Sequence, residues 1–282
     1  MNKDRPSQQE LLRRHGVRPV KRRGQNFLVD GNMARAIAAD IMTFGDHVLE
    51  LGAGGGALTQ PLLEAGAHVA AVEVDRNLCA VLRELMADEA RFTLLEADIA
   101  RLDWGQALTA AGDRPVMAGN LPYVLTSEVL FALADWRERV AGAIFMVQRE
   151  VAQRLAAEPG GRDYGVLSVL LGSLFEIEVV RIVPPEVFWP RPDVVSAVVR
   201  LAPRDDSWSD EAFARFKALV KGLFQQRRKK VGKILRRLCG VDDHTVVDWL
   251  TRVGIDPDDR PERIPRDQLR ALAEIVPGVE SN

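Results

Sequence analysis

Cysteine is scarce in this chain of 282 residues. Cys79 and Cys239 lie far apart and lack the close spacing of metal ligands. We therefore expect two buried thiols in a reducing cytosol and no metal site.

Long hydrophobic runs are also missing. No uninterrupted apolar stretch approaches the length of a membrane span, and the polar start at residues 1–6 lacks the hydrophobic region of a secretory signal. These absences predict a cytoplasmic protein with no membrane partner.

The remaining composition is that of a globular protein, with 47% hydrophobic and 28% charged residues. The length predicts one large domain, or one large and one small domain. We find no internal repeat or low-complexity segment.

The net charge of −2 hides an uneven distribution. Basic residues concentrate in segments 1–23 and 227–237, and the rest of the chain is acidic. Two basic segments on an acidic body favour a polyanionic partner, RNA or DNA, although each segment alone is typical of a solvated helix face. The candidate RNA contacts are Arg22, Arg23, Arg227, Arg228, Lys229, Lys230 and Lys233.

Strand and helix patterns alternate over most of the chain. We predict strands at 47–51, 68–74, 92–96, 115–119, 142–147, 176–182 and 195–201. Helices are expected before and between them at 31–42, 57–65, 77–86, 127–136, 149–156 and 166–174. Only helices are expected later, at 210–224, 229–238, 245–253 and 266–275.

This order predicts an α/β fold, a Rossmann-like sheet followed by a small all-helical domain. The polar segment 202–209 is the best boundary between them. The expected organisation is a basic N-terminal arm at 1–23, with at most a short helix, a Rossmann-like domain at 24–203 and a helical domain at 204–282.

A glycine-rich turn follows the first predicted strand. Gly52 and Gly54 let the backbone approach a ligand closely and present free N–H groups at a helix N-terminus. Glu73 ends the next strand, at a spacing that suits bonds to ribose hydroxyls. These residues fit NAD as well as S-adenosylmethionine. Asp98, after the third strand, is placed to bond an adenine amino group and favours the latter.

Residues 120–123 follow the fourth strand, where open α/β sheets bind their ligands. The Asn120 side-chain oxygen and the Leu121 carbonyl could hold the two hydrogens of an exocyclic amine. Pro122 stiffens the loop, and Tyr123 offers a face for stacking a flipped base. The combination suits methylation of an amino group on a nucleobase. The alternative is an ordinary loop in which Asn caps a turn and Tyr packs.

Several segments together carry a family resemblance. They are GQNFL at 24–28, LELGAGGGALT at 49–59, VEVD at 72–75, NLPY at 120–123, PPEVFWPRP at 184–192 and FQQRRK at 224–229. In this order they resemble the ribosomal RNA adenine N6,N6-dimethyltransferases, whose relatives include the Erm resistance methyltransferases. The likeness runs from about residue 21 to the end of the chain.

The resemblance implies a class I methyltransferase sheet that binds S-adenosyl-L-methionine. Its implied cofactor contacts are Asn26, Leu28, Gly52, Gly54, Glu73, Asp98 and Asn120. The target adenine would stack on Tyr123, with Phe188 as a second aromatic wall. The implied reaction dimethylates each of two adjacent adenosines in the 3′-terminal hairpin loop of small-subunit rRNA, late in 30S assembly. A monomer is the simplest expectation.

Two departures and three alternatives accompany this interpretation. Val124 stands where the family often has Asn, and Trp189 where a smaller residue is common. The alternatives are an Erm-like enzyme acting on large-subunit rRNA, an assembly checkpoint whose binding matters more than its catalysis, and a nicotinamide-dependent oxidoreductase. The Asn120 loop and the missing substrate domain disfavour the oxidoreductase.

Overall fold

The computed structural model describes residues 8–17, 25–205 and 208–277. Within them the chain divides into two compact units. The first comprises residues up to Ala152 together with Glu178–Pro203, and the second comprises Gln153–Ile177 and the residues from Arg204 onward. In the described ranges, no helix has both the length and the apolar character needed to cross a membrane.

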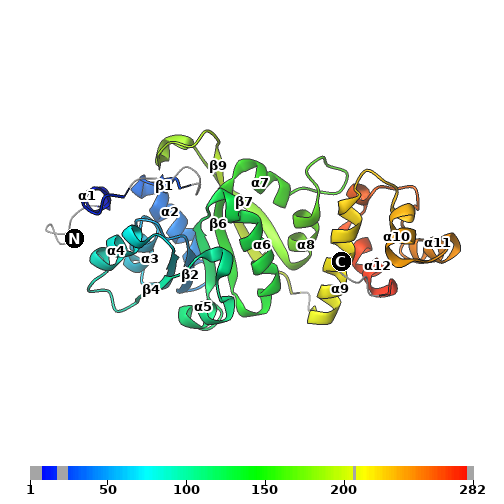
Figure 1. Cartoon of the computed structure of the whole chain (residues 1–282), viewed down its shortest axis with the longest axis horizontal. Helices are drawn as coiled ribbons and strands as arrows, with labels where there is room; N and C mark the ends of the chain where they lie inside the picture. Colours follow the sequence, from blue (N-terminus) through cyan, green and yellow to red (C-terminus); the bar gives the residue numbers. More distant parts are fainter. Residues whose placement is uncertain (1–7, 18–24, 206–207, 278–282) are drawn as a thin grey trace. The chain divides into compact units, whose positions relative to one another are not determined.

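A seven-stranded sheet in the order β4-β3-β2-β5-β6-β9-β7 organises the first unit (Figure 1). The strands are β2 (His47–Leu51), β3 (His68–Glu73), β4 (Phe92–Glu96), β5 (Val116–Asn120), β6 (Gly142–Gln148), β7 (Phe175–Val183) and β9 (Ser196–Pro203). Neighbours from β4 to β6 pair in parallel, and β9 runs antiparallel to β6. The predicted α/β fold class is confirmed.

The order in which the chain adds strands to the sheet changes direction at β2. From β2 the chain steps outward through β3 to β4, and it then returns to place β5 on the other side of β2. The carboxyl ends of β2 and β5 therefore border a topological switch point, the usual ligand crevice of an open α/β sheet.

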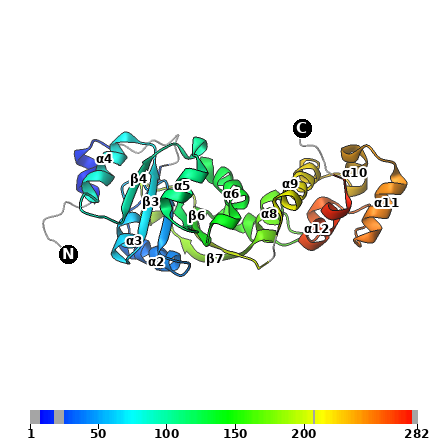
Figure 2. The same ribbon diagram turned by 90° about the horizontal axis from the view of Figure 1, so that it is seen from below.

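Helices cover both faces of this sheet. In Figure 2, α2 (Gly31–Met42) and α3 (Thr59–Glu64) lie on one face, and α5 (Trp104–Ala111) and α6 (Thr126–Asp135) lie on the other. The unit also contains α4 (Arg76–Leu85) and most of α7 (Arg149–Leu155). Asp30 and Asp75 cap α2 and α4 by accepting backbone N–H bonds, which explains where these helices begin.

The described part of the predicted basic arm contains α1 (Gln8–Arg14). Leu11 and Leu12 are buried in the core, and Arg14 and His15 both contact Glu84 of α4, at 2.5 Å and 2.7 Å. Arg22 and Arg23 lie outside the described residues.

A two-stranded antiparallel ribbon also belongs to the first unit. It pairs β1 (Phe27–Leu28) with β8 (Phe188–Trp189), placing Phe27 opposite Trp189 and Leu28 opposite Phe188. Neither strand is apparent from the sequence, where residues 24–30 suggest a turn and residues 184–192 a proline-rich loop.

The second unit is helical. Its described residues include α8 (Val166–Leu174), α9 (Asp210–Gln225), α10 (Val231–Cys239), α11 (Asp243–Arg252) and α12 (Arg266–Ile275). Phe213, Phe216 and Leu223 of α9 are buried, and α9 packs on α8, α10 and α12. Tyr164 is fully buried, and its hydroxyl donates to the Ile264 carbonyl at 3.1 Å. This bond attaches the segment before α8 to the C-terminal helices.

Candidate active site

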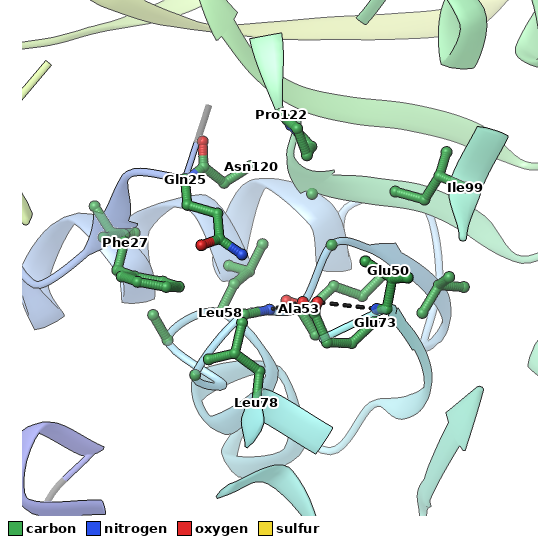
Figure 3. A pocket seen from close by; sticks show the side chains of 18 of the residues that line it. Gln25, Phe27, Glu50, Ala53, Leu58, Glu73, Leu78, Ile99, Asn120 and Pro122 are labelled. Atoms are coloured by element: carbon green, nitrogen blue, oxygen red, sulfur yellow. Dashed lines mark hydrogen bonds between the residues drawn. The ribbon is translucent and has the colours of Figure 1, made fainter. Parts of the chain in front are cut away.

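A cavity of about 280 Å³ opens at the carboxyl ends of the parallel strands of the first unit (Figure 3). Its walls come from the segment around β1, from the loops after β2, β3, β4 and β5, and from residues in α2 and α4. The switch point of the sheet is therefore the place where a ligand can enter.

The glycine turn after β2 forms one wall of this cavity. Gly54 has φ +56°, and a Cβ there would lie 3.2 Å from the Phe27 ring. Any side chain at this position would thus be strained in its backbone and crowded against Phe27. Glycine keeps the turn thin enough for a ligand to approach its backbone.

Glu73 lies at the end of β3 and faces the same cavity. One carboxylate oxygen accepts the Gly54 N–H at 2.8 Å, and the other accepts the N–H groups of Val74 and Asp75 at 2.9 Å. Burial raises the pKa of Glu73, and the three N–H bonds oppose that shift. The carboxylate is thereby fixed in place as an acceptor beside the glycine turn.

Asp98 caps a short 3-10 helix, Ile99–Arg101, after β4 and accepts the Ala100 N–H at 3.0 Å. Both Asp98 and Ile99 line the cavity. The exposed carboxylate and the buried Ile99 side chain thus offer one polar and one apolar contact on the same wall.

Asn120 enters the cavity from the end of β5. A Cβ on the preceding Gly119 would lie 2.4 Å from the Leu51 carbonyl oxygen, so only glycine allows β5 to approach the end of β2 this closely. The Asn120 side-chain Nδ2 donates to the Asn26 carbonyl at 2.8 Å. This bond uses the donor end of the amide and leaves Oδ1 as its acceptor end.

Glu50 is the most deeply buried carboxylate of the cavity wall, with 2% of its surface exposed. The Thr59 hydroxyl donates to it at 2.6 Å. Burial, reinforced by repulsion from Glu73, raises the pKa of Glu50 to about 8. Glu50 thus retains its proton at neutral pH, and it lines the same cavity as Gly52 and Glu73, which were expected to bind the cofactor.

A family model described as "Ribosomal RNA adenine dimethylase" matches residues 18–276. "Ribosomal RNA small subunit methyltransferase A" from Anaeromyxobacter sp. (strain K) is 46% identical, covering 95% of this chain and 96% of that protein. The chain belongs to the ribosomal RNA adenine dimethylase family.

Two solved structures of similar proteins share the fold. A dimethyladenosine transferase from Plasmodium falciparum superposes with TM-score 0.73 at 22% identity, covering 87% of this chain and 96% of that one. The 23S rRNA methyltransferase ErmE superposes with TM-score 0.67 at 26% identity, covering 89% and 99%. The family model and the 46% identical relative confirm the predicted family, the enzyme class of rRNA adenine dimethyltransferase and the cofactor S-adenosyl-L-methionine.

The cavity of this dimethylase gathers every residue expected to hold the cofactor. These residues are Asn26, Leu28, Gly52, Gly54, Glu73, Asp98 and Asn120. Carboxylates for hydroxyl and amino groups, glycines at the turn and apolar walls suit S-adenosylmethionine. The individual roles of these residues stay predictions.

The residues expected to hold the target base are arranged differently. Pro122 lines the cavity, whereas Leu121 is buried and donates its N–H to the Met146 carbonyl at 3.1 Å. Tyr123 is half-buried, and its hydroxyl lies 3.0 Å from Ser196 Oγ of β9. Phe188 is 4% exposed and belongs to the hydrophobic core. Its function as a second aromatic wall remains a prediction.

The sequence interpretation missed other walls of the dimethylase cavity. Phe27, Glu50, Leu58, Leu78 and Ile99 all contribute side chains to it (Figure 3). Phe27, Glu50 and Leu58 lie inside the segments that carry the family resemblance, and that placement was the signal by which they could have been found. Leu78 and Ile99 are apolar residues that the sequence does not distinguish from core residues.

Four of the five predicted RNA contacts of the second unit fall into two groups. Arg227 pairs with Glu262 at 3.0 Å, and Lys230 pairs with Asp258 at 2.8 Å. Within the described residues, Arg228 and Lys233 are exposed and have no ion-pair partner. Lys229 is exposed and contacts Gln226 at 3.0 Å.

Proposed function

We propose that the enzyme dimethylates N6 of two adjacent adenosines in the 3′-terminal hairpin loop of small-subunit rRNA, within a nearly assembled 30S subunit. The relatives named as small-subunit methyltransferases support this target, at up to 46% identity over nearly the whole chain. The observation that carries the chemistry is that Asn120 and the glycine turn line the same cavity. The backbone carbonyl oxygen of Asn120 would lie 3.9 Å from a Cβ added to Gly52.

In this proposal, hydrogen-bond acceptors prepare the amine for attack. Asn120 Oδ1 accepts one N6 hydrogen because its Nδ2 is already bonded to the Asn26 carbonyl. The Leu121 carbonyl accepts the other, since the Pro122 carbonyl is already bonded to the Leu125 N–H at 2.9 Å. Holding both hydrogens favours a tetrahedral nitrogen whose lone pair is less delocalised into the ring. The residues contribute mainly by positioning the base, and no covalent enzyme intermediate is required.

The ring of Tyr123 supplies the stacking face for the adenine, and its bond to Ser196 limits how the ring can turn. Bound S-adenosylmethionine supplies an electrophilic methyl group on its sulfonium. Glu73 binds the ribose hydroxyls and Asp98 the adenine amino group of that cofactor. The backbone N–H groups of the glycine turn approach its polar end.

The target can be tested with subunits that lack the modification. Undermethylated small subunits, incubated with the protein and labelled cofactor, should gain dimethyladenosine at two adjacent positions near the rRNA 3′ end. Purified large subunits treated identically should gain none. Label that appears only in large-subunit rRNA would instead support an Erm-like target, a possibility to which the similarity with ErmE gives weight.

We further propose that the methyltransferase domain, 24–203, is assisted by two RNA contacts: the basic arm, 1–23, and the helical domain, 204–282. The exposed basic residues of the 227–237 segment support the second contact. Phosphate contacts of this kind position the target without reading its sequence. A cytoplasmic monomer without a membrane partner completes the proposal.

The two groups of basic residues provide a matched test of this contact. Replacing Arg228 and Lys233 by glutamine should weaken small-subunit binding and reduce the slope of log affinity against log salt by about one to two. Replacing Arg227 and Lys230 by glutamine removes the same charge, but from residues already paired with Glu262 and Asp258. The slope should change little for this second variant. An unchanged slope for the Arg228 and Lys233 variant would assign the segment to a solvated surface. Equal effects of the two variants would show that the ion pairs do not decide which charges contact the RNA.

A further inference from the structure

Trp189 is unusually exposed for a tryptophan. Its side chain leaves 47% of its surface in solvent, whereas Trp208 and Trp249 are at most 9% exposed. Exposing an indole is unfavourable, and aromatic residues on a surface are characteristic of binding sites. The position of this ring is therefore informative.

The ring is held firmly despite its exposure. Trp189 pairs with Phe27 across the β1–β8 ribbon, and their rings stack with centroids 6.2 Å apart and an interplanar angle of 26°. The neighbouring residue Phe188 anchors the ribbon in the core, and the Val29 N–H donates to the Val187 carbonyl at 2.8 Å. A platform fixed in advance loses little conformational freedom when it binds a ligand.

The platform adjoins the active site. Phe27, on which Trp189 stacks, lines the cofactor cavity. Val124 of the loop after Asn120 also lines this cavity, and it is 68% exposed. Exposed apolar groups thus lie on β8, where Trp189 stacks on Phe27 of the cavity wall, and on the base-holding loop, both in the first unit.

We propose that Trp189 is a stacking platform for a nucleotide next to the target adenosine in the RNA strand. A strand that delivers an adenosine to Asn120 must unstack its neighbours, and their exposed faces need a new partner. An aromatic ring provides one for any base, because every base has a π-face. The inference rests on the RNA target of the proposed function and adds a residue that contacts the flanking strand.

The test compares three variants of the full-length protein. Trp189→Ala removes the platform, Trp189→Phe keeps an aromatic ring, and Ile182→Ala is a control. Ile182 is 53% exposed and lies on β7 of the seven-stranded sheet, outside the β1–β8 ribbon. An RNA fragment of the 3′-terminal hairpin, with fluorescent 2-aminopurine beside the target adenosine, reports stacking directly. Undermethylated small subunits give KM and kcat, and calorimetry gives cofactor affinity.

For Trp189→Ala we expect RNA-fragment affinity to fall about 5- to 100-fold and 2-aminopurine quenching to disappear. KM for small subunits should rise while cofactor affinity stays within about twofold. Trp189→Phe should restore most of the affinity and quenching, and Ile182→Ala should match the wild type.

Three results would overturn the inference. Unchanged fragment binding in Trp189→Ala would exclude stacking. If cofactor affinity fell in parallel with RNA affinity, the role of Trp189 would be to hold Phe27 in the wall of the cofactor cavity. Weakened binding to subunits alone would place the partner of Trp189 outside the hairpin fragment. Failure of the wild-type protein to methylate small subunits would instead refute the proposed function, so the two failures are distinguishable.

Discussion

Replacing Asn120 by alanine should lower the single-turnover rate of methyl transfer about a hundred- to thousandfold. The variant loses the acceptor that we assign to one N6 hydrogen, and losing one positioning interaction of about 3–4 kcal/mol produces a rate change of this size. It also loses the bond from Nδ2 to the Asn26 carbonyl, which orients the acceptor. Rapid-quench measurements with saturating subunits and labelled cofactor would give the rate.

Cofactor affinity is the internal control for this experiment. Asn120 is one of many groups around the cavity, and Glu73 keeps its three backbone bonds when the amide is removed. We expect the dissociation constant of S-adenosylmethionine to rise less than tenfold, so the rate effect should exceed the binding effect. A single-turnover rate close to that of the wild type would refute the catalytic assignment of Asn120.

The cavity was predictable from the sequence because its polar residues follow strand ends. Gly52, Glu73, Asp98 and Asn120 each lie at the end of a predicted strand or within two residues after it. Parallel pairing of β2 with β3 and β5, and of β3 with β4, brings these ends to one edge of the sheet. Local patterns were therefore sufficient to assemble the polar part of the site.

Long-range packing explains what the sequence did not predict. The ribbon of β1 and β8 joins segments about 160 residues apart through two short strands, and no local pattern indicates that pairing. The same pairing buries Phe188 and exposes Trp189. The sequence does not indicate which of these two adjacent aromatic residues is buried. Residues 153–177 group with the helical unit through contacts of α8 with α9 and α12 and a bond from Tyr164 to Ile264, 100 positions later.

The ion pairs of the basic segment could not be predicted from the sequence either. The basic segment 227–237 predicts a positively charged surface, yet it does not indicate which charges are already paired. Arg227 meets Glu262 only because the turn before α12 folds back toward the end of α9. Arg228, the next residue, has no such partner within the described chain. The sequence shows how many basic residues the segment has, whereas the structure shows which of them are free of ion pairs among the described residues and can contact RNA.

Glu50 leads to the second large effect, which concerns stability and pH. Its ordinary pKa of 4.5 rises to about 8 because the folded protein buries it. The native state therefore retains a proton that the unfolded state releases between these two values. Stability falls as pH rises through this interval, because the native state binds more protons than the unfolded state. Below about pH 4.5 both states are protonated and the penalty is absent.

Replacing Glu50 by glutamine should remove this penalty while an amide oxygen still accepts the Thr59 hydroxyl. Relative to the wild type, the variant should gain little stability at pH 5 and about 3–5 kcal/mol at pH 8.5, since each pKa unit is worth about 1.4 kcal/mol. Urea unfolding of both proteins at a series of pH values measures the difference. Subtracting the two curves cancels the titrating groups that do not interact with Glu50, and the difference includes the repulsion between Glu50 and Glu73. A difference that does not change with pH would show that Glu50 ionises normally in the folded protein.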